Sequence, residues 1–195
     1  FIGSDPVRIL HEFGDWRERE VVGLLVSCLA YGRVESIVGS SRELLERLDG
    51  RPRWFLLDRR EGDLREACDG FRHRFTGKKK LTRLLVGARR VLREFVTLEA
   101  CFARCMESSA GEMVGATSGF VKRLAGAPEG IPHLLPSPAG GSACKRLNLF
   151  LRWMGRGDAV DPGGWEIPDP AKLIVPMDVH MGRLARRREE HAREL

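Results

Sequence analysis

Apolar residues recur at every third or fourth position along most of the chain, and this spacing is typical of helices that bury one face. In the segment 17–31 one such stripe precedes Gly32 and consists of Val21, Leu24, Leu25, Cys28 and Leu29. The segment 78–95 has the same period, with leucines on one side and lysines and arginines mostly on the others. We therefore expect a core helix at 17–31 and a long basic helix at 78–95.

Shorter apolar stripes predict further helices at 7–13, 34–48, 52–57, 98–107 and 113–124. Asp5 and Pro6 are the residue types that commonly begin a helix, which places the first start there. The connections are a polar stretch at 58–70, a proline-rich stretch at 126–139 and a Gly/Pro/Asp-rich stretch at 155–172. No segment alternates long enough for a sheet, and no repeat of fixed period occurs. The sequence therefore predicts an all-α fold.

Residues 140–154 predict a glycine-rich turn followed by a helix. Ser142 is a good candidate for the N-cap, because its hydroxyl can accept a hydrogen bond from a free N–H group at the helix start. One face is apolar, with Leu147, Phe150, Leu151 and Met154. A second face is polar and is predicted to point outward, with Lys145, Asn148, Arg152 and Arg156.

The segment 173–181 predicts a second helix start. An apolar run from Leu173 to Met177 leads to Asp178, which stands where an N-cap belongs. The cap position and the helix dipole both favour an ionised carboxylate at that point. A neighbouring ammonium group would favour the ionised form further.

These two stretches together resemble the helix-hairpin-helix DNA glycosylases, the superfamily of endonuclease III and the 8-oxoguanine glycosylases. The resemblance rests on the glycines before Lys145, on Asn148 three positions later, and on the run from Val175 to Met181, which is similar to the segment that carries the catalytic aspartate in eukaryotic 8-oxoguanine glycosylase. It implies a helical fold in which Lys145 is the nucleophile and Asp178 is its carboxylate partner. It also implies that DNA contacts come from Arg33, Gly140, Gly141, Ser142, Arg146, Asn148 and Arg152.

The chain also departs from that pattern. Gly141 matches the first glycine of the usual hairpin motif, but Ala143 replaces the second, and Lys145 and Asp178 are 33 residues apart, more than in endonuclease III. The cysteines do not have the spacing of the iron–sulfur ligands of endonuclease III. Over most of its length the chain more closely resembles an uncharacterised bacterial family within the superfamily, through features such as residues 30–33, 71–75 and 145–154.

Composition and charge favour a globular protein with an anionic partner. The chain has 195 residues, 43% of them hydrophobic, and a net charge of +6. These values suit one domain, with a barrel-like lobe at about 17–155 and a second lobe formed from the termini. The excess of positive charge favours double-stranded DNA, with acidic membrane second, although a solvated arginine-rich surface would give the same net charge. We expect a monomer that does not enter a membrane, because no apolar run approaches the length of a membrane span.

The five cysteines and the chain ends set further expectations. An odd number of cysteines without a framework spacing, and without a secretory signal, indicates a reducing cytoplasm. Cys101 and Cys105 share a helix face but lack further ligands nearby, so we expect neither a metal nor another cofactor. The chain begins at Phe1 without a methionine and stops at Leu195 without a helix cap. We therefore expect truncation at both ends, including part of the lobe after Asp178.

The chemistry that these residues allow is excision of a damaged, and in particular an oxidised, base. A carboxylate stabilises the positive charge that develops on the sugar, and a neutral lysine amine attacks C1′ to give a Schiff base, as in a glycosylase with AP-lyase activity. The aromatic and basic run 71–75 and Trp165 are candidates for stacking on nucleic acid, although 71–75 also suits an anchored loop with solvated charges. Two alternatives remain open: a non-catalytic DNA-binding module of the same fold, and a helical protein-interaction scaffold.

Overall fold

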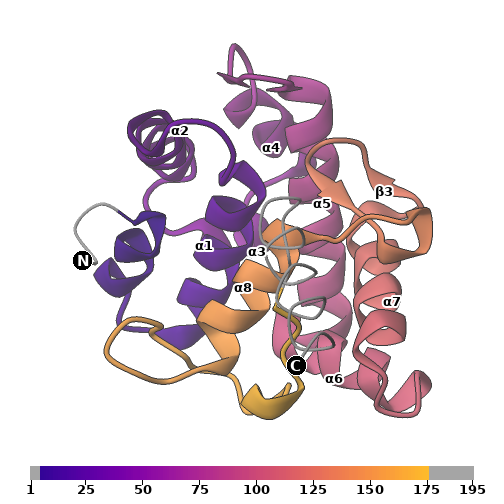
Figure 1. Cartoon of the computed structure of the whole chain (residues 1–195). Coiled ribbons are helices and arrows are strands. Elements are labelled where there is room, and N and C mark those ends of the chain that lie inside the picture. Colours follow the sequence, from indigo (N-terminus) through magenta and orange to yellow (C-terminus); the bar gives the residue numbers. More distant parts are fainter. Residues whose placement is uncertain (1–4, 176–195) are drawn as a thin grey trace, which may run out of the picture.

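The computed structural model describes residues 5–175 and confirms the all-α class (Figure 1). The α-helices are α1 (Trp16–Leu29), α2 (Val34–Arg47), α3 (Pro52–Asp58), α4 (Glu61–Ala67), α5 (Lys78–Phe95), α6 (Leu98–Ser108), α7 (Met113–Ala125) and α8 (Lys145–Gly155). Within residues 5–175 three short 3-10 helices occur, η2 (Pro6–Glu12), η3 (Pro138–Gly140) and η4 (Pro170–Lys172). None of the helices in this range is both long and apolar enough for a membrane span.

Two very small antiparallel hairpins connect the helices. In the first, β1 (Arg72–His73) pairs with β2 (Thr76–Gly77), and in the second, β3 (Gly130–Ile131) pairs with β4 (Leu135–Pro136). The second hairpin lies within the proline-rich stretch that the sequence predicts to be extended. The polar stretch at 58–70, which the sequence predicts to be a connection, contains α4, a helix of seven residues.

Helix α1 is the centre of the core, as its apolar stripe predicts. Every residue from Glu20 to Leu29 is buried, and α1 contacts η2, α2, α3, α6 and α8. Figure 1 shows α8 lying beside it in the middle of the molecule. Gly23 permits this approach, because a Cβ atom there would be 3.3 Å from the Phe150 ring. The hydrophobic core continues without a break from Val7 to Trp165.

Helices α5, α6 and α7 pack together on the other side of the molecule. The backbones of α5 and α7 meet at Gly87, where a Cβ atom would lie 1.6 Å from the carbonyl oxygen of Leu124. The prediction that the basic residues of α5 lie mostly outside is wrong for Arg89, which is buried and donates to the carbonyl of Arg59. A buried guanidinium is tolerated where its N–H groups find acceptors.

Candidate active site

Helix α8 begins two residues later than the cap prediction required, because its N-cap position is 144 and not 142. Gly141 adopts a left-handed conformation with φ 75°, and the Ser142 hydroxyl accepts a hydrogen bond from the Cys144 N–H at 3.1 Å. Ser142 therefore closes a tight turn, and the prediction that it is the N-cap is wrong. Cys144 occupies the N-cap position without a side-chain hydrogen bond to the helix. The first N–H groups of α8 are thus left without a side-chain cap, as in helix starts that bind anions.

The polar face of α8 lines a cavity of about 570 Å³. Lys145, Asn148, Arg152 and Arg156 all contribute to it, so the prediction that they share a face is confirmed. The remaining lining is mostly apolar and consists of Ala30, Leu149, Pro170, Leu173, Ile174 and Val175, together with Arg146. The apolar face of α8 is buried as predicted, with Leu147, Phe150, Leu151 and Met154.

Lys145 is the first residue of α8, and its side chain is exposed at this cavity. Two other residues of the same face, Arg152 and Arg156, form ion pairs with Asp158 and Asp161, whereas Lys145 forms none within the described residues. Within residues 5–175, Lys145 therefore has no carboxylate partner. Its predicted partner, Asp178, lies outside the described residues.

Asn148 is buried rather than presented outward, which corrects the prediction for its side chain. It is only 6% exposed, and its Nδ2 group donates to the carbonyl of Ala143 at 3.1 Å. Its Oδ1 atom is buried without a hydrogen-bond partner among the described residues. Asn148 thus stabilises the turn from inside, while its proposed contact with DNA stays a prediction.

Arg146 joins three parts of the chain. Its two terminal nitrogens donate to the carbonyls of Cys28 and His133 at 2.7 and 2.6 Å, and its guanidinium lies 4.7 Å from the centre of the Tyr31 ring. The two carbonyls compete with any phosphate for these donors. The arrangement makes Arg146 a residue that positions the start of α8 beside α1, and its contact with DNA stays a prediction.

The β1–β2 hairpin carries an exposed aromatic side chain next to this position. Phe75 is 64% exposed, with Arg74 over one side of its ring and His133 at 5.8 Å between ring centres. Arg74 also packs against Gly32, next to the exposed Arg33. We call Arg33, Arg74, Phe75 and His133 the hairpin surface.

Buried hydrogen bonds hold the hairpin in place. His73 is 3% exposed, and its ring nitrogens lie 2.9 Å from the Ser40 hydroxyl and 3.1 Å from the Tyr31 carbonyl. The Tyr31 hydroxyl in turn donates to the carbonyl of His73 at 2.9 Å and lies 2.8 Å from the Thr76 hydroxyl. The 71–75 segment is therefore an anchored loop, and the alternation of its residues presents Arg72, Arg74 and Phe75 while it buries Phe71 and His73.

Trp165 is part of the core, so the prediction that it stacks on a base is wrong. Its side chain is 6% exposed and packs against Phe102 and Phe150 at 6.1 and 5.1 Å between ring centres. Its Nε1 group donates to the carboxylate of Glu20 at 3.0 Å. An indole in a loop otherwise rich in Gly, Pro and Asp serves here as the anchor that holds residues 156–172 against the helices.

The Glu20 carboxylate is the buried acceptor to which the Trp165 indole is bound. It is fully buried and accepts from the N–H groups of Leu98 and Glu99, at the start of α6, at 2.8 and 3.1 Å, as well as from Trp165. Burial raises the pKa of Glu20 to about 7, against the opposing effect of the three N–H donors. One carboxylate thus joins α1, α6 and the loop that forms a wall of the cavity.

The raised pKa predicts how stability depends on pH. Between pH 4.5 and about 7 the folded state keeps the Glu20 proton that the unfolded state has lost, so the free energy of unfolding falls as pH rises through this window. The fall from this group is expected to be about 3 kcal/mol. Urea unfolding at several pH values should show a flatter dependence in Glu20→Gln, whereas the exposed control Glu66→Gln should keep the slope. Equal slopes for the parent and Glu20→Gln would contradict this assignment.

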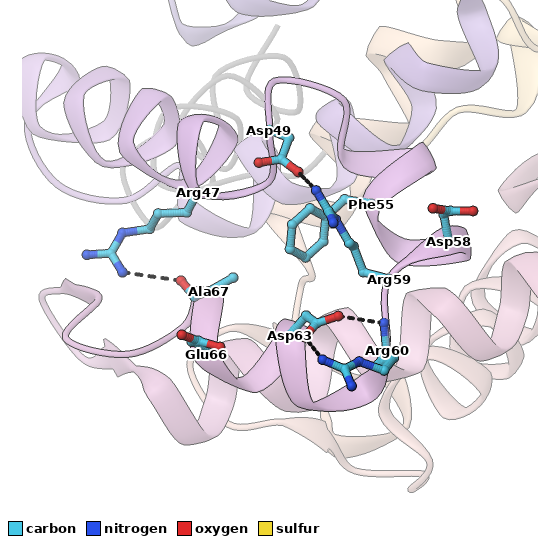
Figure 2. Close-up of a pocket in the computed structure, with 9 residues that line it drawn as sticks. All are labelled: Arg47, Asp49, Phe55, Asp58, Arg59, Arg60, Asp63, Glu66 and Ala67. Carbon is cyan, nitrogen blue, oxygen red and sulfur yellow. Dashed lines mark hydrogen bonds and ion pairs between the residues drawn. The ribbon is translucent and has the colours of Figure 1, made fainter.

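A second cavity, of about 590 Å³, lies between α2, α3 and α4, and its lining is mostly charged (Figure 2). Most of its charges are paired: Arg59 with Asp49 at 2.7 Å and Arg60 with Asp63 at 3.5 Å, while Arg47 donates to the carbonyl of Ala67. Asp58 and Glu66 also line it, as exposed carboxylates. Elsewhere in residues 5–175, no three side chains of His, Cys, Asp or Glu gather as metal ligands would. The cavity beside Lys145 is therefore the better candidate site.

Residues 5–194 match the family described as "Protein of unknown function (DUF2400)". No curated protein and no solved structure matches the chain.

Proposed function

We propose that this chain, which belongs to the DUF2400 family, is a DNA base-excision enzyme of the helix-hairpin-helix glycosylase type, with N-glycosylase and AP-lyase activity on damaged bases. The observation that carries the proposal is the position of Lys145. It is the first residue of α8, directly follows the Gly141 turn, and opens into a cavity with apolar walls. Leu173, Ile174 and Val175, which line the same cavity, lead in the sequence to Asp178.

The proposed reaction uses two side chains. The Lys145 amine attacks C1′ of the damaged nucleotide, the bond from C1′ to the base nitrogen breaks, and the base leaves with a proton. Ring opening of the sugar then gives a Schiff base on Lys145, from which the lyase step proceeds. The Asp178 carboxylate stabilises the positive charge that develops on the sugar. The base has to leave the stack first, because the bond is inaccessible within a duplex.

The surroundings of Lys145 support binding to a duplex. The uncapped N–H groups at the start of α8 suit a backbone phosphate. The hairpin surface adds arginines and an exposed ring, a combination that suits contact with phosphates and bases. Arg146 links the two regions through His133.

DNA affinity is expected to fall steeply with salt, because binding releases counterions from the phosphates. With about three phosphate contacts, from Lys145, Arg33 and Arg74, the logarithm of the association constant should fall with a slope of roughly −3 against the logarithm of salt concentration. Fluorescence anisotropy on a labelled duplex measures this slope. Arg74→Gln should make it shallower by about one, whereas Arg65→Gln, on the exposed face of α4, should not change it. A flat dependence would favour the protein-interaction scaffold.

Covalent trapping distinguishes the enzyme from a non-catalytic DNA-binding module. Borohydride reduces a Schiff base to a stable adduct, so the protein should be captured on an abasic duplex or on a duplex with a suitable damaged base. A module that only binds would show the salt dependence without an adduct. Absence of an adduct on every duplex, in a protein that binds them, would remove the enzymatic proposal.

A further inference from the structure

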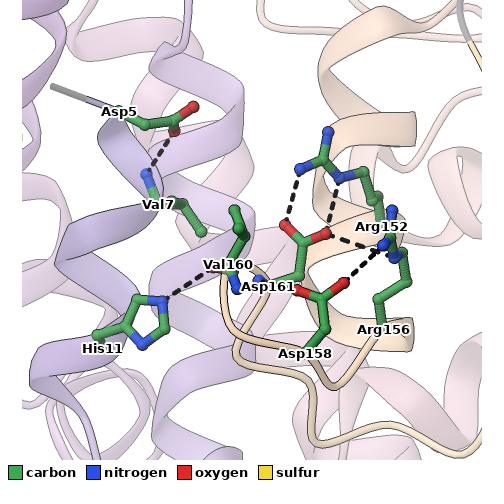
Figure 3. Close-up of polar contacts among 8 residues, drawn as sticks. All are labelled: Asp5, Val7, His11, Arg152, Arg156, Asp158, Val160 and Asp161. Carbon is green, nitrogen blue, oxygen red and sulfur yellow. Dashed lines mark hydrogen bonds and ion pairs between the residues drawn. The ribbon is translucent and has the colours of Figure 1, made fainter. Parts of the chain in front are cut away.

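Arg152 faces the same cavity as Lys145, two turns further along α8. Figure 3 shows its guanidinium paired side-on with the carboxylate of Asp161. Nε donates to Oδ2 at 2.8 Å and Nη2 donates to Oδ1 at 3.0 Å. A pair of parallel hydrogen bonds fixes the plane of the guanidinium as well as its position.

Asp161 is itself held firmly. Its side chain is fully buried, and Arg156 approaches the same carboxylate at 3.7 Å. The Asp161 N–H donates to the Asp158 carboxylate at 2.9 Å, and the Asp161 carbonyl accepts from the Asp158 N–H at 3.0 Å. The buried acid therefore fixes the orientation of Arg152, whose side chain remains 45% exposed.

The pairing leaves part of the guanidinium unused. A guanidinium has five N–H donors, of which Asp161 takes two, and Nη1 has no hydrogen-bond partner within residues 5–175. The Lys145 side chain lies in the same cavity. The unpaired edge of Arg152 is thus a positively charged donor between apolar walls formed by Leu149, Leu173 and Ile174.

We infer that Arg152, positioned by Asp161, donates a hydrogen bond to a carbonyl oxygen on the extruded base. The substrates of the enzyme are therefore neutral bases that carry a carbonyl, and cationic alkylated purines are rejected. The inference rests on the proposed function and names the substrate class of the same site. A ring carbonyl offers the acceptor that Nη1 lacks. A methylated purine that carries a positive charge and no carbonyl offers no acceptor to this edge of Arg152 and meets like charge from its guanidinium instead.

The test compares base release from four duplexes. 8-Oxoguanine and 5-hydroxyuracil carry ring carbonyls, ethenoadenine is neutral without one, and 3-methyladenine is cationic without one. The parent protein should release a carbonyl-bearing base at least ten times faster than either of the others, and this comparison needs no variant. Arg152→Lys keeps a charge beside Asp161 but loses the planar pair of donors. It should slow release of the carbonyl-bearing base by about ten- to a hundredfold, and Arg152→Gln by at least as much.

An abasic duplex separates this inference from the proposed function. It has no base to contact, so the slowing of borohydride trapping on it in either Arg152 variant should be at least about fivefold smaller than the slowing of base release. The matched control Arg104→Gln, on the exposed face of α6, should change neither measurement.

Two results would overturn the substrate class alone: a parent that traps on abasic DNA but prefers ethenoadenine or 3-methyladenine, and a folded Arg152→Lys protein with parental release. A parent that forms no adduct even on abasic DNA removes the proposed function, and the inference with it.

Discussion

Replacing Lys145 by glutamine is expected to abolish the borohydride-trapped adduct on an abasic duplex and to reduce strand cleavage by roughly a thousandfold or more, the scale seen when a catalytic nucleophile is removed. Glutamine has no amine that can form a Schiff base. Lys145→Arg should be equally inactive while it binds the duplex as well as the parent, because arginine binds phosphate but does not form the Schiff base. Gel electrophoresis measures the amount of trapped adduct, and fluorescence anisotropy measures binding to the duplex.

Folding should be unaffected by either change at this position. The Lys145 side chain is exposed and makes no hydrogen bond or ion pair with the rest of residues 5–175, so the free energy of unfolding should change by less than about 0.5 kcal/mol. The decisive comparison is between binding and trapping in Lys145→Arg. If this variant still cleaves a substrate that the parent cleaves, Lys145 is not the nucleophile.

Gly87→Ala is expected to prevent stable folding. The added Cβ atom would lie 1.6 Å from the carbonyl oxygen of Leu124, and this neighbour is backbone that cannot rotate away. Helices α5 and α7 would have to separate, which opens the core around Leu84, Ala88 and Phe120. We expect a loss of more than about 4 kcal/mol, enough to remove the cooperative thermal transition of a domain of this size.

Gly39→Ala is the matched control for Gly87→Ala. Gly39 lies within α2, is exposed, and has no atom within 4 Å of the position of an added Cβ. Alanine there should stabilise the protein by about 0.5–1 kcal/mol, because it reduces the conformational freedom of the unfolded chain. Thermal unfolding followed by circular dichroism should move in opposite directions for the two variants. A Gly87→Ala protein that melts within a few degrees of the parent would show that α5 and α7 do not pack as described.

The parts of the fold that the sequence predicts well are those governed by local periodicity. The buried face of α1, from Val21 to Leu29, and the two faces of α8 follow from residues three and four positions apart. Helix ends were less predictable, because Ser142 uses its hydroxyl in a tight turn and leaves the cap position to Cys144. The same residues are compatible with Ser142 as the N-cap or with Ser142 in a tight turn, and only the backbone conformation decides between the two arrangements.

The polar contacts that hold the site together could not be predicted in this way, because their partners are far apart in the sequence. From the sequence alone, Trp165 is a candidate for stacking on a base. In the structure it lies in the core, in contact with Glu20, 145 positions away. The sequence predicts that Arg146 is a basic residue at the surface, yet its acceptors include the Cys28 carbonyl, 118 positions away. The same limit applies to Arg152, since nothing in the local pattern indicates that Asp161 would be fully buried against it.

The burial of α1 from Glu20 to Leu29 has a mechanical consequence for recognition. Arg146 joins the end of α1 to the start of α8, and the Tyr31 hydroxyl joins the same end to the hairpin that carries Phe75. Lys145 and the hairpin surface are therefore two points on one rigid part of the protein, and their separation is already fixed in the absence of DNA. On the proposed function, a duplex that contacts both points has to match this separation, and any bend or kink that this requires has a cost that depends on how easily its base steps unstack. Damage that weakens stacking lowers this cost, so the stiffness of the protein would itself help to distinguish damaged from intact DNA.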